Sequence, residues 1–106
     1  MVTNKDLTLI YGWANRSFFH DKLPHDLDVR FGCPKGLLGR TIVDVYTGRP
    51  YYMRIADALK FSSNLCVMTV LHEMTHVEQP KKKGHGAWFN KRMKELAQAG
   101  AFNGHW

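Results

Sequence analysis

The segment from about Asn64 to Glu78 limits the possible folds more than any other part of this sequence. Drawn as a helix, it is apolar around most of its circumference, and a helix of that kind has to be buried. A serine, Ser62 or Ser63, can cap its first turn, and Pro80 ends it. We therefore expect a central helix that other elements cover on most sides.

Two further helices are predicted by apolar side chains that recur at three- and four-residue spacing. The first runs from about Asn4 to Phe19, where Thr3 can cap it and Asp6 places a negative charge in its first turn. The last runs from about Ala87 to Ala99. Each has one apolar stripe, which is typical of a helix that covers a core with one face.

The chain between the first two helices is typical of short strands, because its apolar residues alternate with polar ones or are β-branched. The predicted strands are 27–31, 38–46 and 51–55. Turn-forming residues separate them, so we expect a short antiparallel meander. The predicted fold class is therefore α+β: a single domain over residues 1–106, with three main helices and a small three-stranded, mainly antiparallel sheet.

The two cysteines, Cys33 and Cys66, lie far apart and form no C-x-x-C pair. We expect two free, buried thiols rather than a disulfide or a zinc ribbon. No apolar run approaches the ~18 residues needed to span a bilayer, and the N-terminal segment lacks the apolar core of a signal peptide. The default expectation is a cytoplasmic protein that makes no contact with a membrane.

The predicted central helix carries an H-E-x-x-H motif, with His72, Glu73 and His76 as its polar residues. Residues four apart lie on one face of a helix, so both imidazoles can reach one ion at ~2.0–2.1 Å. Glu73 lies beside that ion, where it can hold a water molecule and accept its proton. Because these side chains would be costly to bury without partners, the motif favours a zinc site over structural core histidines.

A catalytic zinc usually has three protein ligands and one open position. His85 is the favoured third ligand, because it lies between Gly84 and Gly86, which allow the backbone to approach an ion closely. Glu95 is its main rival, since a glutamate about this far downstream is the third ligand of thermolysin-like enzymes. The remaining candidates are Glu78, His20, His25 and His105.

The segments Leu71–His76 and Gly84–Phe89 resemble the SprT-like metalloprotease domain, which includes the Spartan proteases. In that family a third histidine in an H-G-x-x-F segment completes the zinc site, and His85–Phe89 matches this segment. The stretches Asn15–Pro24 and Arg54–Leu65 are also similar, so the resemblance covers nearly the whole chain. It implies a minimal zincin fold in which the site lies between the last two helices.

The predicted function is that of a zinc-dependent metallopeptidase acting on protein or peptide substrates, which the resemblance also implies. His72, His76 and His85 would bind Zn²⁺, and Glu73 would be the general base towards a water activated by the ion. Because zincins commonly bind substrates along a strand edge, the resemblance also implies that the strand near Tyr51–Ile55 offers its edge to an extended peptide. Trp88 and Phe89 are expected to pack the last helix against the central one.

Two other functions are compatible with these residues. One is a catalytically inactive, zinc-stabilised module in which a fourth ligand, such as His25 or His105, closes the coordination. The other is a nucleic-acid-binding protein, because the net charge is +6 and a basic surface attracts polyanions such as DNA. Glu73 would be superfluous in both, which favours the hydrolase. The sequence does not predict an oligomeric state.

Overall fold

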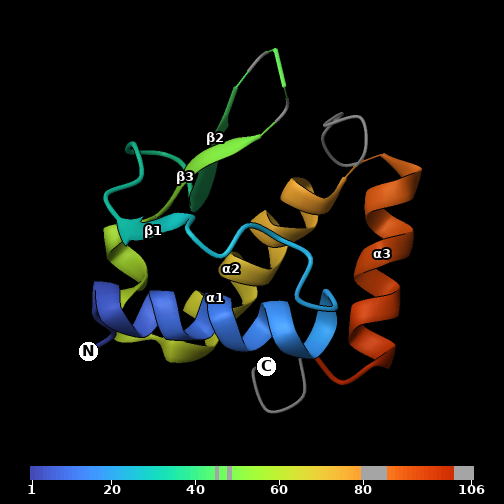
Figure 1. Ribbon diagram of the computed structural model, residues 1–106. Coiled ribbons are helices and arrows are strands. Elements are labelled where there is room, and N and C mark those ends of the chain that lie inside the picture. Colours follow the sequence, from blue (N-terminus) through green and yellow to red (C-terminus); the bar gives the residue numbers. More distant parts are fainter. Residues whose placement is uncertain (45, 48, 80–85, 102–106) are drawn as a thin grey trace.

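The computed structural model describes residues 1–44, 46–47, 49–79 and 86–101. Within these residues the chain forms three α-helices, one 3-10 helix and one three-stranded sheet, which confirms the α+β class. In chain order they are α1 (Asn4–Phe18), β1 (Asp28–Phe31), β2 (Gly39–Val43), β3 (Pro50–Ile55), η1 (Asp57–Phe61), α2 (Ser63–Glu78) and α3 (Ala87–Gln98). Figure 1 shows α2 between the sheet and α3, with α1 running across the molecule.

The sheet is mixed and has the strand order β1-β3-β2. β2 pairs antiparallel with β3, as predicted, whereas β1 pairs parallel with β3. The predicted antiparallel meander is therefore wrong for β1, because an alternating pattern identifies the buried face of a strand and not its neighbour. The expectation that 51–55 offers an edge is wrong as well, since β3 is the central strand and the edges are β1 and β2.

The inward face of the sheet is built around β3, whose Met53 and Ile55 are completely buried. Met53 aligns with Val29 of β1 and with Thr41 of β2, and Ile55 aligns with Gly39 of β2. Alternate residues of a strand point to the same face, so Thr41 and Gly39 share the inward face with these core side chains. Because β2 and β3 both contact α2, β2 brings a hydroxyl group and a glycine against that helix.

α2 is the buried helix that the sequence predicts. Cys66, Leu71 and Met74 are inaccessible to solvent, and the helix contacts α1, β2, β3, η1 and α3. The hydroxyl of Ser62 accepts a hydrogen bond from the amide of Leu65 (3.2 Å), so Ser62 is the N-cap. Neither α2 nor another helix in the described part of the chain is long and apolar enough to cross a membrane.

Both cysteines are free, as predicted. Cys66 is buried, and its thiol donates a hydrogen bond to the carbonyl of Leu59 (3.1 Å). Burial also raises the pKa of this thiol. Cys33 is only half-buried, so the expectation of two buried thiols holds for Cys66 alone.

A buried asparagine fixes the turn that follows α1. Asn15 is 1% exposed; its Nδ2 donates to the carbonyl of Leu23 (3.0 Å), and its Oδ1 accepts from the Leu23 amide (3.1 Å). The turn between them contains His20 and Asp21 at positive φ (53° and 60°), a conformation that is unfavourable for residues other than glycine. The two hydrogen bonds to Leu23 stabilise the turn in that conformation.

Asn15→Ala is expected to lower the free energy of unfolding by about 2 kcal/mol, because it leaves the buried amide and carbonyl of Leu23 without their partners. Urea unfolding followed by circular dichroism measures the change. Ser17→Ala, on the exposed side of the same helix, is the matched control and is expected to stay within about 0.5 kcal/mol of the parent. Equal stabilities of the two variants would contradict a structural role for Asn15.

Candidate metal centre

Three polar side chains lie together on α2: His72, Glu73 and His76. One donor atom from each residue, an imidazole nitrogen or a carboxylate oxygen, lies within 4.8 Å of the other two. The histidines are one helical turn apart, and their ring centroids are separated by 5.0 Å. Both are half-buried, and Glu73 is only 7% exposed. α2 thus gathers two nitrogen donors and a carboxylate at one place, as the motif predicts.

Phe89 of α3 packs against both imidazoles. Its ring centroid lies 4.9 Å from that of His72, in an edge-on arrangement, and 4.4 Å from that of His76, in a stacked one. Phe89 is 4% exposed, so the prediction that it packs the last helix against the central one is confirmed. Trp88 is 38% exposed and contributes less to that interface. The aromatic contact restricts the orientation of the two histidine rings.

Gln79 supports His76 from the end of α2. Gln79 is 2% exposed, and its Oε1 lies 3.4 Å from Nδ1 of His76. An amide oxygen accepts a hydrogen bond from the tautomer of His76 that carries its proton on Nδ1, and in that tautomer Nε2 keeps the lone pair that a metal needs. Histidines that bind metals are commonly oriented by such an oxygen. Gln79 was not identified from the sequence.

Glu73 is held by β2. The hydroxyl of Thr41 donates a hydrogen bond to Oε1 of Glu73 (2.9 Å), which stabilises the ionised carboxylate against its burial. Gly39 gives that carboxylate room, because a Cβ there would lie 3.1 Å from Cγ of Glu73 and 3.0 Å from Cγ2 of Thr69. Sequence analysis missed both residues of β2. The available signal was the glycine inside a predicted strand, which often marks a close approach.

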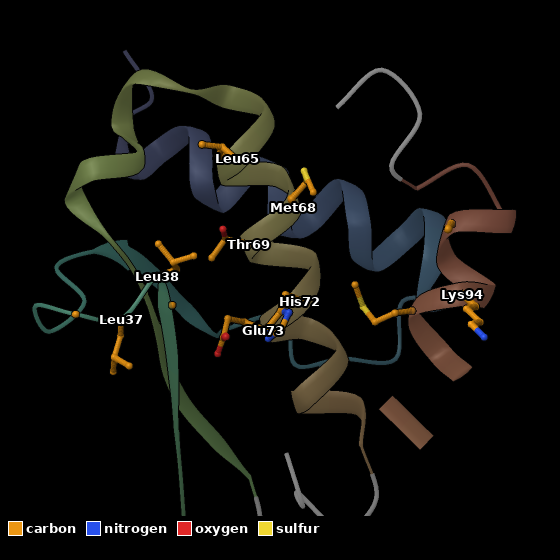
Figure 2. Close-up of a pocket in the computed structure, with 12 residues that line it drawn as sticks. Leu37, Leu38, Leu65, Met68, Thr69, His72, Glu73 and Lys94 are labelled. Atoms are coloured by element: carbon orange, nitrogen blue, oxygen red, sulfur yellow. The ribbon is translucent and has the colours of Figure 1, made fainter. Parts of the chain in front are cut away.

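A pocket of about 760 Å³ lies beside His72 and Glu73, both of which line it. Figure 2 shows that Leu37 and Leu38 approach it from the strand side and that Thr69, His72 and Glu73 follow one another along α2. Six apolar side chains form most of the wall: Leu37, Leu38, Leu65, Met68, Met93 and Ala97. The candidate centre is therefore accessible from a largely apolar pocket.

Cys33 is close enough to Glu73 to respond to its charge. Burial raises the pKa of the Cys33 thiol, the negative charge of Glu73 raises it further, and the positive charge of Arg40 lowers it by less. The thiol is therefore protonated at neutral pH. Because Cys33 also lies outside the group of donor atoms on α2, we do not assign it as a ligand.

The favoured third ligand, His85, lies outside the described residues, and so does His105. The other four candidates lie in the described part of the chain, and none belongs to the donor group on α2. Glu78 and Glu95 both pair with Arg92, at 2.6 Å and 3.9 Å. His25 pairs with Asp21 (3.0 Å), and His20 is exposed in the turn after α1. Our preference for His85 stays a prediction.

Tyr51 and Tyr52 of β3 both lie outside the pocket wall. Tyr51 donates its hydroxyl hydrogen bond to Asp44 (2.9 Å) and is 59% exposed. The ring of Tyr52 lies 4.5 Å from the guanidinium carbon of Arg54. Both tyrosines therefore make structural contacts on the sheet, as is usual for tyrosines in strands.

The donor set on α2 fits zinc, which prefers imidazole nitrogen and carboxylate oxygen ligands. Two histidines one turn apart, with Gln79 behind one ring and Phe89 against both, match the usual support of such ligands. Comparisons with protein-family models, curated proteins and solved structures gave no match. The resemblance to the SprT-like domain therefore rests on the sequence motifs.

His72→Ala and His76→Ala are each expected to abolish tight zinc binding, because each removes one nitrogen donor; His85→Ala is expected to do the same. Gln79→Ala is expected to weaken binding about 10–100-fold, since it removes the group that orients His76. Isothermal titration of metal-free protein with zinc measures both effects. Gln98→Ala, an exposed glutamine on α3, is the control, and a Gln79→Ala affinity equal to that control would contradict the orienting role.

Proposed function

We propose that this protein is a zinc-dependent metallopeptidase that hydrolyses peptide bonds in protein or peptide substrates. His72, His76 and His85 bind the ion, and Glu73 is the general base. The observation that carries the proposal is the position of Glu73: a carboxylate with 7% exposure, within 4.8 Å of two imidazole donors and lining a pocket. A purely structural zinc site has no use for such a carboxylate.

In the proposed reaction the ion and the protein side chains have separate roles. The chemistry supplied by zinc in such a site is acidification of a water molecule, to a pKa near ~7, and polarisation of a peptide carbonyl. Glu73 accepts the proton of the attacking water and then delivers it to the leaving amine. Thr41 donates to Oε1 of Glu73 (2.9 Å), so the carboxylate keeps one orientation while its proton is gained and lost.

We propose that the substrate backbone binds along the free edge of β2 in the described sheet. β2 lies at an edge of the described sheet, and its Gly39 and Thr41 touch or closely approach Glu73. An extended peptide can add to such an edge through its main-chain hydrogen bonds. A peptide bound there would pass directly over the proposed base.

Glu73→Gln is expected to retain zinc and to abolish turnover, because glutamine keeps the shape of the side chain but cannot accept the proton. The loss is expected to be on the order of 10²-fold or more in kcat. Zinc-dependent cleavage of an unfolded protein, with and without DNA, measures it, and metal analysis of the same sample verifies that zinc is present. Normal hydrolysis by zinc-loaded Glu73→Gln would refute the proposed role.

Thr41→Val is expected to lower kcat about tenfold while KM and zinc content stay near those of the parent, because only the base loses its hydrogen bond. Valine preserves the branched shape that suits β2. Thr41→Ser, which restores the hydroxyl, is expected to recover most of the activity. Steady-state kinetics on one peptide measure all three proteins, and a serine variant as impaired as the valine variant would argue against the positioning role.

A second candidate function, nucleic-acid binding, is favoured by one feature of the outer sheet face. Arg30, Arg54 and Arg40 align in one row across the three strands, and Asp28 pairs with the first two (2.8 Å and 3.2 Å). Like charges opposite one another destabilise a sheet, and a bound phosphate backbone would offset that repulsion. Such binding would weaken steeply with salt and would be unchanged in Glu73→Gln, which separates it from the peptidase.

A further inference from the structure

We propose that the pocket beside His72 and Glu73 selects substrates by one large apolar side chain, which enters the pocket while the peptide backbone lies along β2. This inference rests on the proposed function and adds the substrate class to it. The preferred substrates are extended segments with leucine, methionine or aromatic residues next to the cleaved bond. Such residues are exposed in unfolded chains and buried in folded ones.

The wall chemistry is the first argument. Leu38 comes from the strand side of the pocket, Met68 from α2 and Met93 from α3, so apolar groups from three parts of the fold surround the same space. The sulfur of Met93 lies 3.5 Å from the hydroxyl oxygen of Thr75, whose proton is donated to the carbonyl of Leu71 (2.8 Å), and this packing contact restrains the flexible methionine side chain. Lys94 also lines the pocket and is exposed; away from it, a charged substrate side chain would lose its hydration against the apolar walls, whereas an apolar one would be stabilised there.

Exposure around the opening is the second argument. Leu37, Leu38 and Leu65 are 48%, 66% and 47% exposed, and all three line this one pocket. Single exposed leucines are ordinary, but a contiguous group of them marks a surface that binds a partner. Figure 2 shows Leu38 on the strand side and Leu65 on α2, so a side chain seated in the pocket would cover leucines from both parts of the fold.

Continuity with the candidate centre identifies the occupant. His72, Glu73 and Gly39 belong to the same pocket wall, so a side chain seated there is attached to a backbone at the proposed base. Alternate side chains of an extended peptide point to one side, and a peptide along β2 can therefore direct one of them inward. The volume of about 760 Å³ falls in the range of ~300–1,000 Å³ typical of ligand sites, so a phenylalanine or leucine side chain fits.

Two variants test the proposal in the zinc-loaded protein. Ala97→Trp fills the pocket from α3, and Leu38→Asp places a carboxylate on the strand side; both residues are exposed, so both variants are expected to fold. The substrates are quenched fluorogenic peptides with an otherwise polar sequence, in which one residue beside the cleaved bond is phenylalanine, leucine, alanine or aspartate. The parent is expected to favour phenylalanine and leucine over aspartate about tenfold or more in kcat/KM.

Ala97→Trp is expected to reduce cleavage of the phenylalanine peptide about tenfold and cleavage of the alanine peptide by clearly less, so that the preference for phenylalanine over alanine falls. Leu38→Asp is likewise expected to reduce the preference for phenylalanine and leucine over aspartate. Gln98→Trp and Leu9→Asp are the matched controls, because they introduce the same residues at exposed positions outside the pocket wall. Both controls are expected to keep the preference of the parent.

Equal cleavage of all four peptides by the parent, or an unchanged preference in both pocket variants, would overturn the selectivity and leave the peptidase proposal intact. If the parent cleaves none of the peptides, the peptidase proposal fails. The preference of the pocket for apolar side chains is then tested separately, by peptide binding to zinc-loaded Glu73→Gln. Fluorescence polarisation then compares labelled phenylalanine and aspartate peptides. Tighter binding of the phenylalanine peptide, lost when Ala97→Trp is added, supports the pocket; equal binding of the two peptides overturns it.

Discussion

The burial of the Glu73 carboxylate is the constraint on which the rest of this structure depends. An ionised group with 7% exposure requires polar partners, because burial alone disfavours its charge. β2 supplies one of them through Thr41 (2.9 Å), and it can run this close to α2 because Gly39 has no side chain. The antiparallel pairing with the buried β3 keeps β2 in place. Through β2 the sheet therefore stabilises the position of the Glu73 carboxylate on the helix.

On the other side of α2, Arg92 connects α3 to the two other helices. Its Nε donates to Oε1 of Glu78 (2.6 Å), and its Nη2 donates to the carbonyl of Phe18 at the end of α1 (2.7 Å). The guanidinium also lies over the ring of Phe19, with 5.1 Å to its centroid. With 17% of its side chain exposed, Arg92 is partly shielded from competing water, and it keeps α3 aligned so that Phe89 reaches both histidines.

Local patterns predicted the helices, the polar residues of α2 and the packing of Phe89 against that helix, whereas the strand order and the side-chain contacts between β2 and α2 could not be predicted from them. The bounds of all three α-helices differ from the expectation by one residue or less, because apolar spacing and capping residues act within a few turns. The order of the strands was missed, since alternation in β1 carries no information on which strand lies beside it. The roles of Thr41 and Gly39 depend on packing between β2 and α2, at a separation of 32 residues for the Thr41–Glu73 pair.

The position of β2 at the rim of the sheet has a consequence for self-association. A strand without a neighbour on one side can pair with any extended chain, including the same strand of a second molecule. Arg40 is exposed in β2, so a pairing of two copies that places Arg40 opposite Arg40 would bring two guanidinium groups close together and would be disfavoured. A neutral or acidic chain meets no such repulsion. Arg40 therefore disfavours that pairing of the strand with its own copy.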